Sequence, residues 1–113
     1  MAPYIYKICD AGVWRAAEQT GRFTGAGIDL TDGYIHFSTA GQIAGTLALH
    51  FAGNENLLLI EIDSDGLDII YEPARDGQLF PHLYGILELV HVRNIWTLGL
   101  DSDNLHILPT LSG

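Results

Sequence analysis

Two histidine-containing segments carry the residue types that could do chemistry in this chain. The first reads DGYIHFSTAGQ and places His36 and Ser38 two residues apart in an alternating pattern. The second reads ARDGQLFPHLYG and sets His82 among aromatic residues. An imidazole can donate, accept or transfer a proton near neutral pH, and aromatic rings offer stacking faces. Together the two segments predict a polar, aromatic ligand pocket.

The spacing around His36 indicates which way its side chain points. Side chains alternate between the two faces of a strand, so Ile35 and Phe37 share one face while His36 and Ser38 share the other. A capping-box pair, Thr39 and Gln42, follows directly and predicts a helix start. Free amide groups at a helix start attract anions. We therefore expect His36, Ser38 and Thr39 to line a small polar pocket.

Structural roles remain open for the same residues. A strand histidine such as His36 can simply satisfy a hydrogen bond with a neighbour, and an aromatic loop can simply plug a core. Arg22, in the glycine-rich stretch GRFTGAG, could reach an anion or be solvated. The candidate ligand-binding residues are Arg22, Tyr34, His36, Ser38, Thr39, Phe80, His82 and Tyr84.

Metal binding and nucleophilic catalysis are poorly indicated. Zinc sites usually show close ligand pairs, whereas the five histidines are scattered at positions 36, 50, 82, 91 and 106. A site built from His36, His82 and Glu72 is conceivable but has no spacing signature, so no metal is predicted. Ser38 lacks the Gly-x-Ser-x-Gly context of a hydrolase. Cys9 lies in a strand-like segment, where buried thiols are usually inert.

Composition and charge limit the partners. The 113 residues carry a net charge of −9 with five basic side chains, so a nucleic-acid partner is not expected. A small anion or nucleotide held by one or two arginines is compatible with this charge. No apolar run reaches the roughly 20 residues of a membrane span, and no secretory signal is expected. With one cysteine, a cytoplasmic location is expected. We expect a monomer or a weak homo-oligomer.

Two early helices and a larger number of strands must position these residues. Strands are predicted at 4–9, 34–38, 56–63, 68–73, 86–92 and 95–100, with an edge segment at 105–108. Helices are predicted at 11–19, capped by Asp10, and at about 40–51. Segments 20–33 and 74–85 are predicted to be long loops. This order favours a single α+β domain over 1–113, with about six strands and two helices.

The motifs resemble a bacterial family known as domain of unknown function 952. The segments that carry this resemblance are IYKICDAGVWRAA, DGYIHFSTAGQ, LLLIEID, YEP and LFPHLYG, in this order. They span nearly the whole chain. That family has no established activity, so membership by itself implies no reaction.

The chain also resembles, more distantly, the NAD-binding core of ADP-ribosyltransferases. The shared feature is a strand ending His-hydrophobic-Ser, followed by a capped helix and an apolar strand. This resemblance implies an ADP-ribosylation-like fold, a bent and split β structure, with NAD or an ADP-ribose derivative as ligand. It implies that His36 orients a ribose hydroxyl, that Tyr84 or Phe80 stacks on nicotinamide, and that Arg22 meets the diphosphate.

Catalysis is less clearly implied than binding. His36 and Glu72 are the candidate catalytic residues under this resemblance. The first strand, YIYKIC, lacks the arginine or His-Gly pair with which those enzymes grip the ribose of NAD. Three functions therefore stay open: an enzyme or former enzyme of the ADP-ribosyl type, a non-catalytic metabolite-binding module, and a protein-interaction domain.

Overall fold

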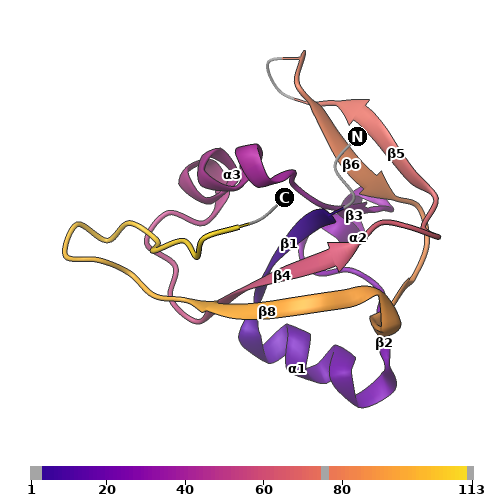
Figure 1. Cartoon of the computed structure of the whole chain (residues 1–113), viewed down its shortest axis with the longest axis horizontal. Helices are drawn as coiled ribbons and strands as arrows, with labels where there is room; N and C mark the ends of the chain where they lie inside the picture. The colour runs from indigo at the N-terminus through magenta and orange to yellow at the C-terminus, as the bar shows by residue number, and fades with distance from the viewer. Residues whose placement is uncertain (1–3, 75–76, 112–113) are drawn as a thin grey trace.

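A three-stranded antiparallel sheet forms the centre of the computed structural model, which describes residues 4–74 and 77–111 (Figure 1). Strand β4 (Leu57–Asp63) lies between β1 (Tyr4–Asp10) and β8 (Val92–Leu98). The β1–β4 ladder runs without interruption from the Tyr4–Asp63 pair to the Asp10–Leu57 pair. The prediction of a central strand at 56–63 is confirmed.

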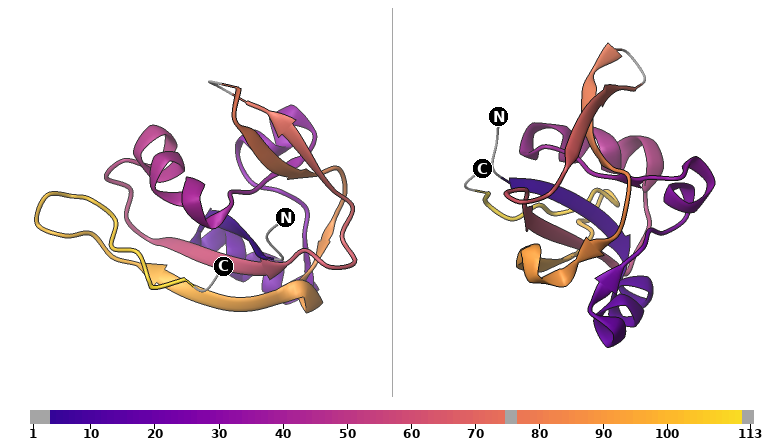
Figure 2. Two further views of the ribbon diagram at one scale, coloured as in Figure 1. Left: turned by 45° about the horizontal axis from the view of Figure 1, so that its top comes forward. Right: turned by 90° about the vertical axis from the view of Figure 1, so that its right-hand side faces the viewer.

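Both faces of this central sheet are covered, which explains why β4 is apolar almost throughout. Leu58 and Ile60 belong to the hydrophobic cluster that contains Trp14 of helix α1 (Ala11–Thr20). The alternate residue Leu59 belongs to the cluster of helix α3 (Ile43–His50). The two helices lie on opposite sides of the sheet (Figures 1 and 2). A strand buried on both faces needs apolar residues at successive positions.

The helix starts follow the predicted capping residues. The Asp10 carboxylate accepts hydrogen bonds from the amides of Gly12 and Val13 at the start of α1. The capping box of Thr39 and Gln42 is present, and it begins with a short 3₁₀ turn, η1 (Ala40–Gln42), that leads into α3. The helix predicted at about 40–51 is therefore confirmed, with its first turn wound more tightly.

A second three-stranded sheet has the order β3–β6–β5 and is made from β3 (Ile35–His36), β6 (Leu79–Leu83) and β5 (Ile69–Pro73). The β5–β6 hairpin rises away from the central sheet (Figure 1). Strands β2 (Arg22–Phe23) and β7 (Leu87–Glu88) form a third, two-stranded sheet. We refer to the β3–β6–β5 sheet as the small sheet.

Both predicted long loops are wrong. Segment 20–33 contains β2 and the short helix α2 (Ile28–Asp32), and segment 74–85 contains β6. Pro81 made the second segment resemble a loop because proline lacks an amide hydrogen. Its carbonyl nevertheless accepts a hydrogen bond from the Phe37 amide at 3.0 Å, and it pairs with Tyr71 in the β5–β6 ladder.

The ends of the predicted strands also differ in the last third of the chain. Segment 86–92 divides into β7 and a 3₁₀ turn, η3 (Leu89–His91), and segment 105–108 forms only the isolated bridge of Leu100 with His106. The α+β class is confirmed. The described residues hold eight strands in three sheets and three α-helices, more than the six strands and two helices predicted. Within those residues no helix has the length and apolar character to cross a bilayer.

Candidate functional site

Four rings gather on one face of the small sheet. His36 on β3 lies directly opposite His82 on β6, and one step beyond the ladder the same register sets Tyr34 opposite Tyr84. The Tyr34 ring contacts His36, His82 and Tyr84 at centroid separations of 4.6, 4.4 and 4.8 Å. The two imidazoles are 5.2 Å apart. Cross-strand neighbours on one face are expected to touch in this way.

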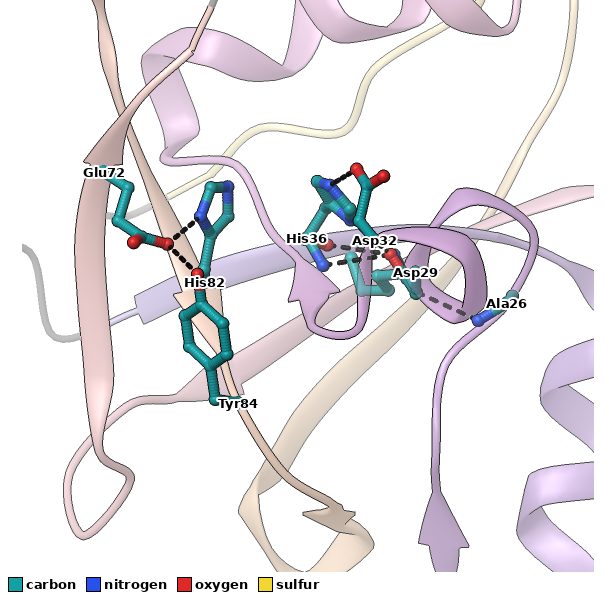
Figure 3. A network of polar contacts seen from close by, with 8 residues as sticks. Ala26, Asp29, Asp32, His36, Glu72, His82 and Tyr84 are labelled. Carbon is teal, nitrogen blue, oxygen red and sulfur yellow. Dashed lines mark hydrogen bonds and ion pairs between the residues drawn. The ribbon is translucent and has the colours of Figure 1, made fainter.

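Each histidine of this group is held by carboxylates (Figure 3). His36 Nδ1 lies 2.7 Å from Asp29 Oδ1, and its Nε2 lies 3.1 Å from Asp32 Oδ2. His82 Nδ1 lies 2.8 Å from Glu72 Oε1. We call the four rings and these three carboxylates the two-histidine cluster; its members are Asp29, Asp32, Tyr34, His36, Glu72, His82 and Tyr84.

Asp29 is the buried anchor of the cluster, with its side chain 1% exposed. Its Oδ2 accepts from Lys7 Nζ at 2.7 Å and from the Ala26 amide at 3.0 Å, while Oδ1 accepts from the His36 amide at 3.0 Å. Burial by itself would raise the pKa of Asp29, but Lys7 and these hydrogen bonds hold that pKa below its ordinary value. Burial also lowers the pKa of Lys7, although Asp29 opposes the shift.

The backbone around Asp29 requires glycine. Gly25 has a φ of +119°, and a Cβ placed there would lie 2.9 Å from the Asp29 Cβ. Helix α2 then ends at Gly33, which has a left-handed φ of +85° and donates its amide to the Asp29 carbonyl. Two glycines therefore let one short helical turn carry Asp29 and Asp32 toward His36.

Glu72 and Tyr84 hold His82 from the other side. The Tyr84 hydroxyl donates to Glu72 Oε1 at 2.7 Å, the same oxygen that His82 Nδ1 contacts (Figure 3). The hydrogen bonds from His82 and Tyr84 lower the pKa of Glu72. The hydrogen bond to Glu72 raises the pKa of Tyr84 to about 12. An ionised carboxylate only accepts, so His82 Nδ1 carries a hydrogen, and in the neutral ring Nε2 is left as an acceptor.

This arrangement can orient imidazoles and accept a proton or a hydrogen bond. His82 is 4% exposed, and its Nε2 makes no hydrogen bond within residues 4–74 and 77–111. His36 differs, because both of its ring nitrogens face carboxylate oxygens and only the doubly protonated ring donates to both. The two histidines therefore have different hydrogen-bonding roles.

The structure brings together four of the eight candidate ligand-binding residues and one further candidate, Glu72. The four are Tyr34, His36, His82 and Tyr84. Ser38, Thr39, Arg22 and Phe80 take other positions. Ser38 is buried and its hydroxyl contacts Thr46 at 3.0 Å, Thr39 is occupied in the capping box, and Arg22 pairs with Glu88 at 3.5 Å. Phe80 is half-buried on β6 and contacts none of the four rings among the described residues.

The expected pocket of His36 with Ser38 and Thr39 is therefore not formed. Between His36 and Ser38 the chain passes from the small sheet to the central sheet, where Ser38 and Tyr6 exchange two backbone hydrogen bonds of 2.8 Å. The alternation that pairs His36 with Ser38 does not survive this change of partner strand. Ser38 consequently points toward α3.

Sequence reasoning missed Asp29, Asp32 and the role of Lys7. Both aspartates fall in the segment predicted to be a loop, so no direction was predicted for their side chains. Their spacing of three residues is a helical signal that places them on one side of a turn. Lys7 gave a weaker signal: a charged residue at the middle of an apolar strand requires a buried partner.

Two hollows in the described surface lie apart from the cluster. One, of about 350 Å³, lies between α1 and β2 and includes Arg22 and Phe23. The other, of about 430 Å³, lies beside α3 and includes Leu47 and Leu105. The cluster lies outside both hollows, and its rings range from the buried His82 to the exposed Tyr84. Among the described residues, no three His, Cys, Asp or Glu side chains are grouped so that they could hold a metal ion.

The fold and the cluster define a small α+β protein with paired histidines held by carboxylates. The chain belongs to the family described as "Protein of unknown function (DUF952)", which it matches over residues 8–95. A search of curated proteins found no match.

Solved structures of one protein agree with this assignment. The crystal structure of Protein CC0527 from Caulobacter crescentus is 40% identical, covers 92% of this chain and 93% of its own, and superposes with a TM-score of 0.86. A double mutant of that protein gives the same values, and its solution NMR structure gives a TM-score of 0.82 over 92% and 91% of the two chains. These matches support the resemblance to domain of unknown function 952. They give no support to the resemblance to ADP-ribosyltransferases.

Proposed function

We propose that this chain binds a small organic ligand at the two-histidine cluster, with His82 Nε2 as the hydrogen-bond acceptor for it. One observation carries the proposal: a nearly buried imidazole is fixed by Glu72 through Nδ1 while Nε2 has no partner among the described residues. Nε2 is not among the fully buried unpaired atoms of the described residues, so it can be reached from the surface, and an oriented acceptor there suits a ligand donor.

The neighbouring rings suggest the shape of that ligand. Tyr84 is 53% exposed beside the Tyr34 ring, which gives a flat group a stacking surface next to His82. A ligand with one flat portion and one hydroxyl or amine donor would satisfy both features. The stacking surface and the acceptor together favour ligand binding. His82 Nε2 could also accept a proton from the bound group.

Ribose-containing compounds meet these requirements through their hydroxyls and their bases. NAD and ADP-ribose are included in the test because the HFS strand and the helix after it resemble those of ADP-ribosyltransferases in sequence. The proposed function is binding without reaction. His36 and Glu72 stay candidates for catalysis only if turnover is found.

The test is an NMR titration of ¹⁵N-labelled protein with NAD, ADP-ribose, adenosine and nicotinamide riboside at millimolar concentration. We expect the imidazole nitrogens of His82 and the amide of Tyr84 to shift on binding of at least one compound. His82→Asn should lower the affinity at least tenfold, because its amide can still donate toward Glu72 while Nε2 is lost. His50→Ala, which removes an exposed histidine on α3, should bind like the parent.

Two results would contradict the proposal. One is the absence of any shift at His82 with every compound. The other is equal affinity for the parent and the His82→Asn variant.

A further inference from the structure

The charges around the two-histidine cluster are mostly negative. Asp29, Asp32 and Glu72 all lie within hydrogen-bonding distance of its rings. The cations in contact with them are Lys7 and, when protonated, His36; His82 acts as an acceptor only when it is neutral, and in that state the carboxylates are in excess. The side chains of Asp32 and Glu72 are 35% and 34% exposed, which places both where a ligand can meet them.

Lys7 cannot balance this charge for a ligand. Its side chain is 8% exposed, and Nζ is occupied by Asp29 at 2.7 Å and by the His36 carbonyl at 2.9 Å. Both contacts are with the elements that carry the cluster, α2 through Asp29 and β3 through His36. Likewise both nitrogens of His36 are already directed at carboxylates.

The other cations of the described residues are paired elsewhere. Arg15 contacts Glu18 within α1, and Arg22, the residue expected to meet a diphosphate, pairs with Glu88. Arg93 contacts the Tyr4 hydroxyl. Within residues 4–74 and 77–111, no lysine or arginine is therefore directed at a ligand on this cluster.

The pKa of Tyr34 is consistent with this excess of negative charge. Burial and the charges of Asp32 and Glu72 raise the pKa of Tyr34, because ionising this phenol would place another anion beside them. Aromatic faces combined with carboxylates attract organic cations, whereas a phosphate would meet repulsion.

We infer that the ligand of this cluster is a phosphate-free organic cation with a planar ring. The inference rests on the proposed function, and it specifies the ligand class that the site takes. A cationic ring stacks on Tyr84 close to Glu72, and a hydroxyl of the same molecule donates to His82 Nε2. A phosphorylated form of the same molecule binds more weakly, because its added charge faces Asp32 and Glu72, and no lysine or arginine of the described residues is directed there to offset it.

A matched pair of compounds tests this. Nicotinamide riboside carries the cationic ring and hydroxyls, and nicotinamide mononucleotide differs from it only by a 5′-phosphate. By calorimetry at low salt we expect the riboside to bind at least about tenfold more tightly, which corresponds to about 1.4 kcal/mol. The difference should shrink as salt is raised, because the Debye length falls to about 10 Å at 0.1 M.

Two carboxylate variants locate the effect. Asp32→Asn and Glu72→Gln should each weaken riboside binding at least threefold and narrow the difference between the two compounds. Asp32 provides the second variant in case Glu72→Gln disturbs His82. Glu18→Gln, which removes an equal charge on α1, should change neither affinity.

The outcomes separate the two proposals. If the mononucleotide binds as tightly as the riboside or more so, with His82 still shifting, the charge selection is wrong and the ligand site stands. If no compound, including neutral adenosine, shifts His82, the ligand site itself is wrong and the inference falls with it.

Discussion

The buried contact between Lys7 and Asp29 offers the sharpest test of how the cluster is held together. Asp29→Asn keeps the size of the side chain and removes its charge, which leaves Lys7 Nζ in a site where its side chain is 8% exposed. Breaking a buried ion pair on one side typically costs about 3–5 kcal/mol, because the remaining charge is left without compensation. Small domains have a total stability of about 5–15 kcal/mol, so the loss is a large part of the whole.

Urea unfolding followed by tryptophan fluorescence measures this loss, and Trp14 in the core provides the signal. With a urea dependence of about 1.5 kcal/mol per molar, within the usual range, the midpoint should fall by about 2–3 M. Lys7→Met/Asp29→Asn removes both charges. The double variant should be more stable than the sum of the single losses predicts, by about 2–3 kcal/mol, because the two side chains touch.

The pH dependence has a defined sign. The pKa of Asp29 is lower in the folded protein than its ordinary value, so the folded state binds fewer protons in acid than the unfolded state does. Ionised Asp29 therefore contributes to the free energy of unfolding above about pH 4, the unperturbed pKa of aspartate, and this contribution is lost as the pH falls through the folded pKa. The double variant should lack it. A loss below about 1 kcal/mol for Asp29→Asn, or additive single effects, would refute the reasoning.

Three further predictions concern Cys9, Tyr84 and Gly25. Burial raises the pKa of Cys9 to about 11, so the folded protein should react with Ellman's reagent at pH 8 far more slowly than the protein in denaturant; equal rates would show that the thiol is accessible. Tyr84→Phe removes a hydrogen bond that lowers the pKa of Glu72, so that pKa, followed by carboxyl NMR, should rise, and an unchanged value would argue against the contact. Gly25→Ala should destabilise by about 1–3 kcal/mol in thermal unfolding, because of its positive φ and close approach to α2. Gly41→Ala, at an open position without positive φ, serves as its control, and similar midpoints for the two variants would be contrary to this account.

Local patterns predicted the elements that local forces determine. The alternation of Ile35 and Phe37 correctly predicted two buried residues, and Asp10 and Thr39 correctly predicted helix starts. The apolar run of β4 indicated a strand in the middle of a sheet. In each case the residues that decide the structure are neighbours in sequence.

The cluster depended on contacts that no local pattern contains. Tyr34, His36, His82 and Tyr84 were each identified as candidates, yet the register that joins them is set by the pairing of β3 with β6. Asp29 was missed because a five-residue helix between glycines has too little periodicity to be distinguished from a loop. Ser38 was misplaced because the chain changes sheets immediately before it.

The joint between β3 and β6 has a consequence for hydrogen exchange. The β1–β4 ladder contains seven residue pairs, whereas β3 and β6 share only two, Ile35–Leu83 and His36–His82. Short ladders open at lower free energy than the core of a fold, so His36 can separate from His82 without global unfolding. A ligand that touches both halves would oppose this opening and slow the exchange of amides on the two strands. Slower amide exchange on β3 and β6 would therefore detect a ligand bound at the cluster, even a ligand that undergoes no reaction.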